Sequence, residues 1–347
     1  MLKKIVNPLV LASIALLPLM SACSSDSKKE TEAKKSSEPV KKEVAVSKIG
    51  HDYNVQPKKV ADGIWCMFGV LDGPTKENGG FMSNSCYIQT KDSWVLWDTG
   101  ATYKFAEQAY AAMKKIKDMP VSTVLISHEH DDHWLGAGYY QKNFGAKVIG
   151  SKLIARDFKP GHEAETRMYR ILTPETVEGT KIITVDETAK EGTTTYNIGG
   201  LEMKYVSLGK AHSEDDYLLY LPSKNVVLAA DVIMNGRITS NRDGSVLGQI
   251  KAIKAVKNLN WDVCVPGHGF ITDKTATDES TLYFKLLKER ILKALDDDVE
   301  ATEINEVVTL PEFKKAAMYD MLNSNNVSAA YTELEMADDP EAPEYSF

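Results

Sequence analysis

The spacing of apolar residues predicts short strands alternating with helices from about residue 55 onward. Apolar residues at helical spacing between Tyr103 and Lys117, closed by Pro120, predict a helix. The unbroken β-branched run Val121–Ile126 is typical of a strand buried on both faces. Strands are also expected earlier, with the last two joined as a hairpin, at Ile64–Val70, Cys86–Thr90 and Ser93–Trp97.

In the second half of the chain the pattern again predicts strands alternating with helices, and then helices alone. Two strand clusters separated by helices predict sheets covered by helices, an α/β sandwich in layers. Beyond Thr277 we expect helices at Leu282–Leu295, near Glu303, at Pro311–Leu322 and in a terminal stretch near Val327, and a disordered acidic tail over 336–347. The intervening strands are expected at Lys147–Ile149, Lys181–Val185, Met203–Leu208, Tyr217–Leu221, Val226–Ala229 and Val263–Val265, and the helices at Ala137–Asn143 and Gln249–Lys257.

The first 50 residues are not part of this pattern. A short basic region and an apolar stretch lead to Ser21-Ala22-Cys23, which resembles a bacterial lipoprotein signal with Cys23 as the acylated first mature residue. A plain signal peptide cut after Ala22 is the alternative, and either signal takes the protein out of the cytoplasm. Residues 24–50 are rich in Lys, Glu and Ser, which predicts a flexible tether. We therefore expect a signal peptide over 1–22, a tether over 23–50, a main folded domain over 51–275 and a helical extension with the tail over 276–347.

Charge and cysteine content narrow the class of protein. A net charge of -8 argues against a nucleic-acid binder, which would be basic. The membrane contact we expect therefore depends on the acyl chain at Cys23, with an outer membrane or cell surface as the location. Cys66 and Cys86 lie in adjacent predicted strands, so a disulfide is possible; together with Cys264 they are interpreted here as buried free thiols.

The candidate chemistry begins directly after the buried strand. Histidine and aspartate are residue types that bind zinc in open catalytic sites. Four of them occur within six residues, at His128, His130, Asp132 and His133. They lie on a loop at a strand end, so they can converge only around a small volume. One metal ion cannot comfortably use all four, and the spacing therefore favours two metal ions.

Three further candidates follow at other strand ends. His212 comes after the strand expected to end at Leu208, Asp231 closes Leu228-Ala229-Ala230-Asp231, and His268 sits in Pro266-Gly267-His268-Gly269. Loops at strand ends are where α/β enzymes place reactive groups. Five of the seven histidines of the chain fall in these motifs, which argues against chance placement.

The ordered set HxHxDH, an isolated His, a strand-end Asp and PGHG resembles the metallo-β-lactamase superfamily over about residues 60–269. The resemblance implies a four-layer αββα sandwich carrying a C-terminal helical extension. It implies that Asp98 supports the metal ligands without binding metal itself. It also implies that Asp231 bridges two metal ions, most simply zinc. It assigns the first ion to His128, His130 and His212, and the second to Asp132, His133 and His268.

The expected activity is hydrolysis of a small-molecule ester, thioester, lactone or lactam by a hydroxide shared between two zinc ions. Asp132 is the candidate for orienting that hydroxide. The alternatives are a metallo-β-lactamase proper, a mononuclear iron persulfide dioxygenase, and a non-enzymatic lipoprotein that delivers zinc. The segment from Asn326 to Glu335 also resembles, weakly, the end of metallohydrolases found with sulfur-oxidation and quinoprotein systems.

Several nearby residues have less specific signals. Lys210 and Arg237 are candidates for binding an anionic substrate, although most such charges are only solvated. His51 is interpreted as a residue at the tether edge, and His162 as part of a loop over the site. The Gly-rich segment 72–84 is expected to form a flap over the metal ions.

Overall fold

The computed structural model describes residues 50–154, 156 and 159–347. The predicted signal peptide, the lipidation site at Cys23 and all but the last residue of the predicted tether lie outside the described residues. Within the described part, no helix is both long enough and apolar enough to cross a membrane.

The early strands form one seven-stranded sheet in the order β1-β2-β3-β4-β5-β6-β7. The first four strands pair antiparallel, and β4 to β7 pair in parallel. All four side chains of β4 are buried, as expected for a strand with covered faces. The strands are β1 (Lys58–Ala61), β2 (Ile64–Met67), β3 (Ser85–Gln89), β4 (Trp94–Trp97), β5 (Val121–Leu125), β6 (Lys147–Gly150) and β7 (Glu187–Thr188).

The later strands form a five-stranded sheet in the order β12-β11-β10-β9-β8. Only β11 and β12 pair in parallel; the others are antiparallel. β11 is buried along its whole length, and β12 is an edge strand, which is where Pro266 is tolerated. The strands are β8 (Thr193–Ile198), β9 (Leu201–Gly209), β10 (Asp216–Leu221), β11 (Val226–Met234) and β12 (Val263–His268).

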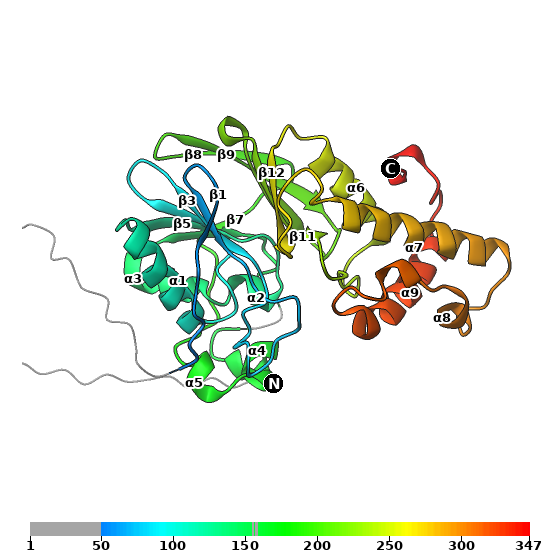
Figure 1. Cartoon of the computed structure of the whole chain (residues 1–347), viewed down its shortest axis with the longest axis horizontal. Helices are drawn as coiled ribbons and strands as arrows, with labels where there is room; N and C mark the ends of the chain where they lie inside the picture. The colour runs from blue at the N-terminus through cyan, green and yellow to red at the C-terminus, as the bar shows by residue number, and fades with distance from the viewer. Residues whose placement is uncertain (1–49, 155, 157–158) are drawn as a thin grey trace, which may run out of the picture. The chain divides into compact units, whose positions relative to one another are not determined.

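The two sheets pack face to face, with helices on both outer faces (Figure 1). Their shared core joins residues of the first sheet such as Trp97 and Leu125 to residues of the second such as Tyr205 and Val265. Helices α1 (Tyr103–Ile116) and α3 (Ala137–Phe144) cover the first sheet; α6 (Val246–Lys257) and α7 (Asp278–Asp296) cover the second. The predicted αββα sandwich is therefore confirmed.

The helical extension contributes to the core of the second sheet. Side chains of α7 and α9 (Tyr319–Glu335) pack in the same apolar cluster as β11 and α6. The boundary predicted near residue 275 stays a prediction. The remaining short helices are α2 (Asp131–Trp134), α4 (Arg167–Ile171), α5 (Pro174–Val177) and α8 (Ile304–Val307).

Two predictions about this extension are wrong. The expected helix Pro311–Leu322 is only a 3-10 turn at Pro311–Phe313, and α9 starts at Tyr319. The intervening Ala317 instead exchanges backbone hydrogen bonds with Gly236 and Ile238, which holds it out of a helix. The tail expected to be disordered packs on α6 and α7, because Lys254 and Lys288 donate to carbonyls of residues 343–345.

Strand predictions failed where apolar periodicity was misleading. Residues 181–185 form no strand, although Ile182 and Ile183 are buried. The β6 edge is occupied instead by Asp186, whose N–H donates to Val148, and then by β7. The short strand β1 and the edge strand β8 were not predicted; in β8, three threonines and Asn197 leave only Tyr196 and Ile198 as large residues that pack on the core.

The cysteine interpretation is partly wrong. β2 and β3 pair in a register that places Cys66 directly opposite Cys86, and the two form a disulfide. Cys264 is a buried free thiol, as predicted. Strand register decides between a disulfide and two thiols, and the sequence did not reveal that register.

Candidate metal centre

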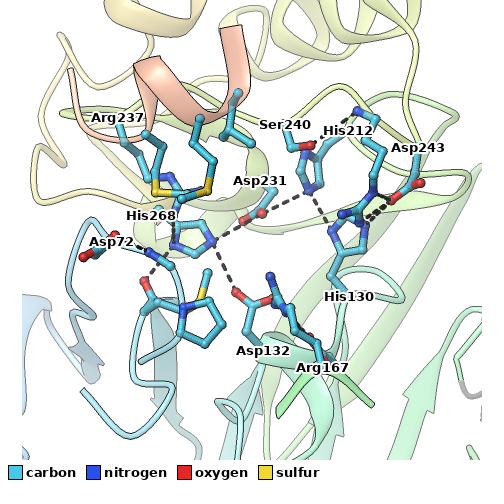
Figure 2. Close-up of a pocket in the computed structure, with 18 of the residues that line it drawn as sticks. Asp72, His130, Asp132, Arg167, His212, Asp231, Arg237, Ser240, Asp243 and His268 are labelled. Atoms are coloured by element: carbon cyan, nitrogen blue, oxygen red, sulfur yellow. Dashed lines mark hydrogen bonds and ion pairs between the residues drawn. The ribbon is translucent and has the colours of Figure 1, made fainter. Parts of the chain in front are cut away.

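All seven predicted ligands converge at one end of the two sheets. Figure 2 labels His130, Asp132, His212, Asp231 and His268 among them. The loop after β5 and helix α2 carry four of them, so one short segment supplies more than half of the cluster. The turn between β9 and β10, the strand β11 and the end of β12 supply the others. The seven residues are His128, His130, Asp132, His133, His212, Asp231 and His268.

The side chains fall into the two groups that the sequence predicts. His130 Nδ1 lies 3.1 Å from His128 Nε2 and 2.9 Å from His212 Nε2, so three ring nitrogens face one point. In the other group, Asp132 Oδ2 lies 3.5 Å from His133 Nε2 and 3.4 Å from His268 Nε2. Within each group the ligand atoms lie within 4.8 Å of one another.

Asp231 lies between the two groups. Its Oδ2 is 3.1 Å from His212 Nε2 and 3.4 Å from His268 Nε2. Its Oδ1 is 3.2 Å from His133 Nε2. One carboxylate is therefore within ligand distance of both groups, as a bridging residue must be.

The backbone at two carboxylates adopts a conformation that few side chains accept. Ala230, just before Asp231, has φ 46°, and the pairing of β11 with β12 shifts register there. Asp98, at the end of β4, has φ 54°. Such φ values cost energy in non-glycine residues and are concentrated at functional sites. Here they direct the Asp231 and Asp98 side chains toward the histidines.

The far nitrogen of each histidine ligand has a hydrogen-bonding partner. These partners fix the orientation of each ring and leave its other nitrogen facing the centre, which is the usual arrangement behind metal-binding histidines. Asp98 thus lies where the sequence predicted. The partners are Ser127 Oγ for His128 (2.9 Å), Asp243 Oδ2 for His130 (3.2 Å), Asp98 Oδ2 for His133 (2.8 Å), Thr239 Oγ1 for His212 (2.9 Å) and the Met82 carbonyl for His268 (2.7 Å).

Several ligand atoms are buried without a hydrogen bond. Among the described residues, Asp132 Oδ2, His133 Nε2 and Asp231 Oδ1 have no hydrogen-bonding partner of acceptable geometry. Buried polar atoms are nearly always paired, so three orphans at one point indicate a missing bound group. Imidazole nitrogen and carboxylate oxygen are the donors that zinc takes in catalytic sites. The residues present therefore fit a pair of metal ions.

Electrostatics favour the protonation state that a metal ligand needs at His128 and Asp231, and oppose it at His133. Burial lowers the pKa of His128 well below its usual value, so its ring is neutral near pH 7. Burial would raise the pKa of Asp231, but the surrounding histidines outweigh it and hold that pKa well below its usual value. For His133 burial is outweighed by three carboxylates, which raise the pKa. A metal ion must therefore displace a proton from His133, and acid should weaken binding.

Arg167 and Asp243 are site residues that the sequence did not reveal. Arg167 Nη2 donates to Asp131 Oδ1 at 2.7 Å and to Asp132 Oδ1 at 2.8 Å. This bond occupies Oδ1 of Asp132 and leaves Oδ2 facing the histidines. Both residues lie in polar segments without a recognisable motif, so no signal in the sequence could have identified them.

A cavity of about 730 Å³ opens onto the centre. This volume is within the range of small-molecule sites. The segment predicted to be a flap lines this cavity through Asp72–Thr75 and Met82, and its movement stays a prediction. Arg237 also lines it, whereas among the described residues Lys210, His51 and His162 do not. His162 is instead an exposed partner of Glu165, so its expected place over the site is wrong.

Similarity to known proteins agrees with this geometry. The profile of the Metallo-beta-lactamase superfamily matches residues 78–268, more than half of the chain. Metallo-beta-lactamase IND-1 of Chryseobacterium indologenes is 27% identical over 188 residues, which cover 54% of this chain and 65% of that protein. Alkyl/aryl-sulfatase BDS1 of Saccharomyces cerevisiae is 21% identical over 311 residues, which cover 76% of this chain and 48% of that protein. The chain thus spans less than two thirds of either relative.

The fold agrees with a solved structure. The stereoselective inverting sec-alkylsulfatase Pisa1 from Pseudomonas sp. superimposes with a TM-score of 0.61 at 18% identity, covering 83% of this chain and 52% of that one. The profile match spans the loop after β5, the β9–β10 turn and the ends of β11 and β12, where the seven ligand candidates lie. This chain belongs to the metallo-β-lactamase superfamily.

Proposed function

We propose that the chain is a hydrolase that uses two metal ions, most simply zinc, held by the seven clustered side chains. The observation that carries the proposal is the position of Asp231, within ligand distance of both groups. The unpaired buried atoms of Asp132, His133 and Asp231 support it. A storage or delivery site would not need a cavity of about 730 Å³ beside the ligands.

Bound zinc would activate water and polarise the bond to be cut. Around it the chain's own residues have separate tasks. The Asp98 carboxylate accepts from the Ser127 N–H and hydroxyl, at 2.8 Å each, and fixes the ring of His133. Arg167 holds Oδ1 of Asp132, so Oδ2 is the oxygen that can bind metal or accept a proton from water.

The function is tested by hydrolysis assays on protein with and without metal. The panel should hold a carboxylic ester, a thioester, a lactone, a sulfate ester and the lactam nitrocefin. We expect turnover of at least one class, its loss after chelation, and its return with zinc. Equal turnover before and after complete metal removal would contradict the proposal, as would activity confined to oxidation of a persulfide with consumption of oxygen.

A β-lactamase is the second candidate, favoured by the relative named metallo-beta-lactamase IND-1. The relative named alkyl/aryl-sulfatase favours a sulfate ester instead. Nitrocefin and the sulfate ester in the panel separate the two.

Asp243 should support the first metal site. Its Oδ2 accepts from Nε2 of His130, and this hydrogen bond holds the pKa of Asp243 below its usual value. We expect Asp243→Asn to weaken metal binding about 10- to 100-fold, the usual effect of losing such a support. Competition with a chromogenic chelator measures it. Glu165→Gln is the matched control, because Glu165 bonds His162 in the same way away from the cavity. Equal metal affinity for both variants would show that Asp243 does not support the ligand.

We also propose that the protein is an extracytoplasmic lipoprotein anchored through Cys23. The basis is the Ser21-Ala22-Cys23 junction after an apolar stretch. Cys23→Ser should abolish incorporation of labelled fatty acid and release the protein from membranes. Membrane retention with undiminished labelling would refute the anchor.

A further inference from the structure

Arg237 is a buried cation beside the metal centre. Its side chain is 7% exposed and lines the cavity. Its guanidinium makes only long contacts, from Nε to the Ile238 carbonyl and from Nη1 to His268 Nδ1, both at 3.4 Å. Among the described residues no carboxylate lies within 4.0 Å of it. A buried guanidinium without a counter-ion is costly, so a partner is expected from outside the chain.

The other arginines of the cavity are in a different situation. Arg167 pairs with Asp131 and Asp132, and Arg242 with Asp243. Arg170 is exposed, where water screens its charge. Arg156 pairs with Glu214. Arg237 is therefore the arginine whose charge is left for a ligand.

Apolar side chains also line the cavity, and three of the six come from the extension. Ala317 pairs with the chain beside Arg237, which brings Met318 and α9 over the mouth. In Figure 2 this helix, in pale red, lies above His268 with methionine sulfur atoms below it. Met321 is 63% exposed, although methionine prefers burial. The apolar lining residues are Met82, Ile171, Met234, Met318, Met321 and Leu322.

Charge balance adds to the case for an anion. The ligand set holds two carboxylates and five imidazoles, so two divalent cations would leave the cluster with a net positive charge. Arg237 would add a further positive charge, because its guanidinium is separated from the metal centre only by the imidazole ring of His268. Positive potential in a walled cavity raises the local concentration of anions. Unbranched, polarisable methionine side chains adapt to a flexible alkyl chain.

We propose that the substrate is an amphiphilic anion: an anionic group beside the scissile bond binds Arg237, and an alkyl chain lies along the methionine wall from Met318 and Met321. The inference rests on the proposed function for the cutting step and on Arg237 and the wall for binding. It excludes neutral esters and small hydrophilic anions as preferred substrates.

Binding of inert probes to the metal-loaded chain tests the inference by calorimetry. Decane-1-sulfonate and decanoate carry the chain with either anionic head; decan-1-ol lacks the charge, and methanesulfonate lacks the chain. We expect a decane anion to bind about tenfold or more tightly than either control, since both charge-assisted bonds and buried methylenes contribute. Which head binds tighter identifies a sulfate-type or a carboxylate substrate. Equal affinity for decan-1-ol and both anions would overturn the inference.

Variants separate the two parts of the site. Arg237→Met keeps side-chain length and should lose about tenfold or more in affinity for the anion, with Arg237→Lys in between. Arg170→Met is the matched control and should change affinity by about twofold at most, because its charge is exposed. Met318→Ala with Met321→Ala should reduce the gain in affinity from hexane- to decane-sulfonate and leave methanesulfonate unaffected. Unchanged binding by Arg237→Met, with an unchanged unfolding midpoint, would refute the role of Arg237.

The binding result and the proposed function can fail separately. Tight binding of decane-1-sulfonate without hydrolysis of any panel substrate would contradict the function and leave the anion site standing. Fast hydrolysis of neutral esters with no binding of either anion would contradict the anion site and leave the hydrolase function standing.

Discussion

Asp231→Ala is expected to lose hydrolytic activity by about 1000-fold or more, because a metal pair supplies several kcal/mol of transition-state stabilisation. Asp231 is 3% exposed and is the residue within ligand distance of both groups. Without it, the group of Asp132, His133 and His268 keeps three ligands but nothing joins it to the first group. Steady-state kinetics together with metal content of the same preparation measure the effect.

Two further variants control this experiment. Asp231→Asn preserves shape and removes the charge, so it should also lose activity if charge and bridging matter more than packing. Asp62→Ala removes a carboxylate from the exposed surface and should behave as wild type. If Asp231→Ala keeps both its second metal ion and its turnover, Asp231 does not bridge.

Gly267→Ala should empty the centre although it removes no ligand. A Cβ at residue 267 would lie 1.9 Å from Asp231 Oδ1 and 2.6 Å from the Ala230 carbonyl carbon. Real atoms do not approach so closely, and the backbone there belongs to the paired strands β11 and β12. The carboxylate must therefore move. We expect metal binding to be lost, activity to fall as far as in Asp231→Ala, and the unfolding midpoint to decrease.

The matched control is Gly138→Ala in α3. Its Cβ would meet the Ile183 side chain at 3.3 Å, which can adjust, and alanine favours a helix. That variant should keep its metal and its stability. Normal metal content and activity in Gly267→Ala would show that the packing against Asp231 is not required.

The ligand set could be predicted because each member follows a strand or lies in one. The parallel strands β4 and β5 bring their carboxyl ends to one edge of the first sheet, so Asp98 and His128 meet there. His268, at the end of β12, reaches them from the second sheet. Strand identity followed from apolar runs such as Val121–Leu125. Local pattern was enough for these residues.

Features set by tertiary contacts could not be predicted. Lys314–Met318 has a helical pattern but forms turns and a bridge, because Ala317 donates to the Gly236 carbonyl and accepts from the Ile238 N–H. The Cys66–Cys86 disulfide depends on strand register. Asp243 meets His130 across a sequence distance of 113 residues, with no motif around it. The same tertiary contact at Ala317 places the methionine wall, which periodicity alone would have assigned to a surface helix.

Metal content per chain tests the central claim most directly. Native mass spectrometry of the protein, purified without added metal and then loaded with zinc, counts bound ions on each intact chain. The arrangement around Asp231 predicts about two zinc ions per chain, bound together, and about one or none in Asp231→Ala. A wild-type chain that holds a single iron ion, or that saturates at one zinc ion with full hydrolytic activity, would contradict the paired centre.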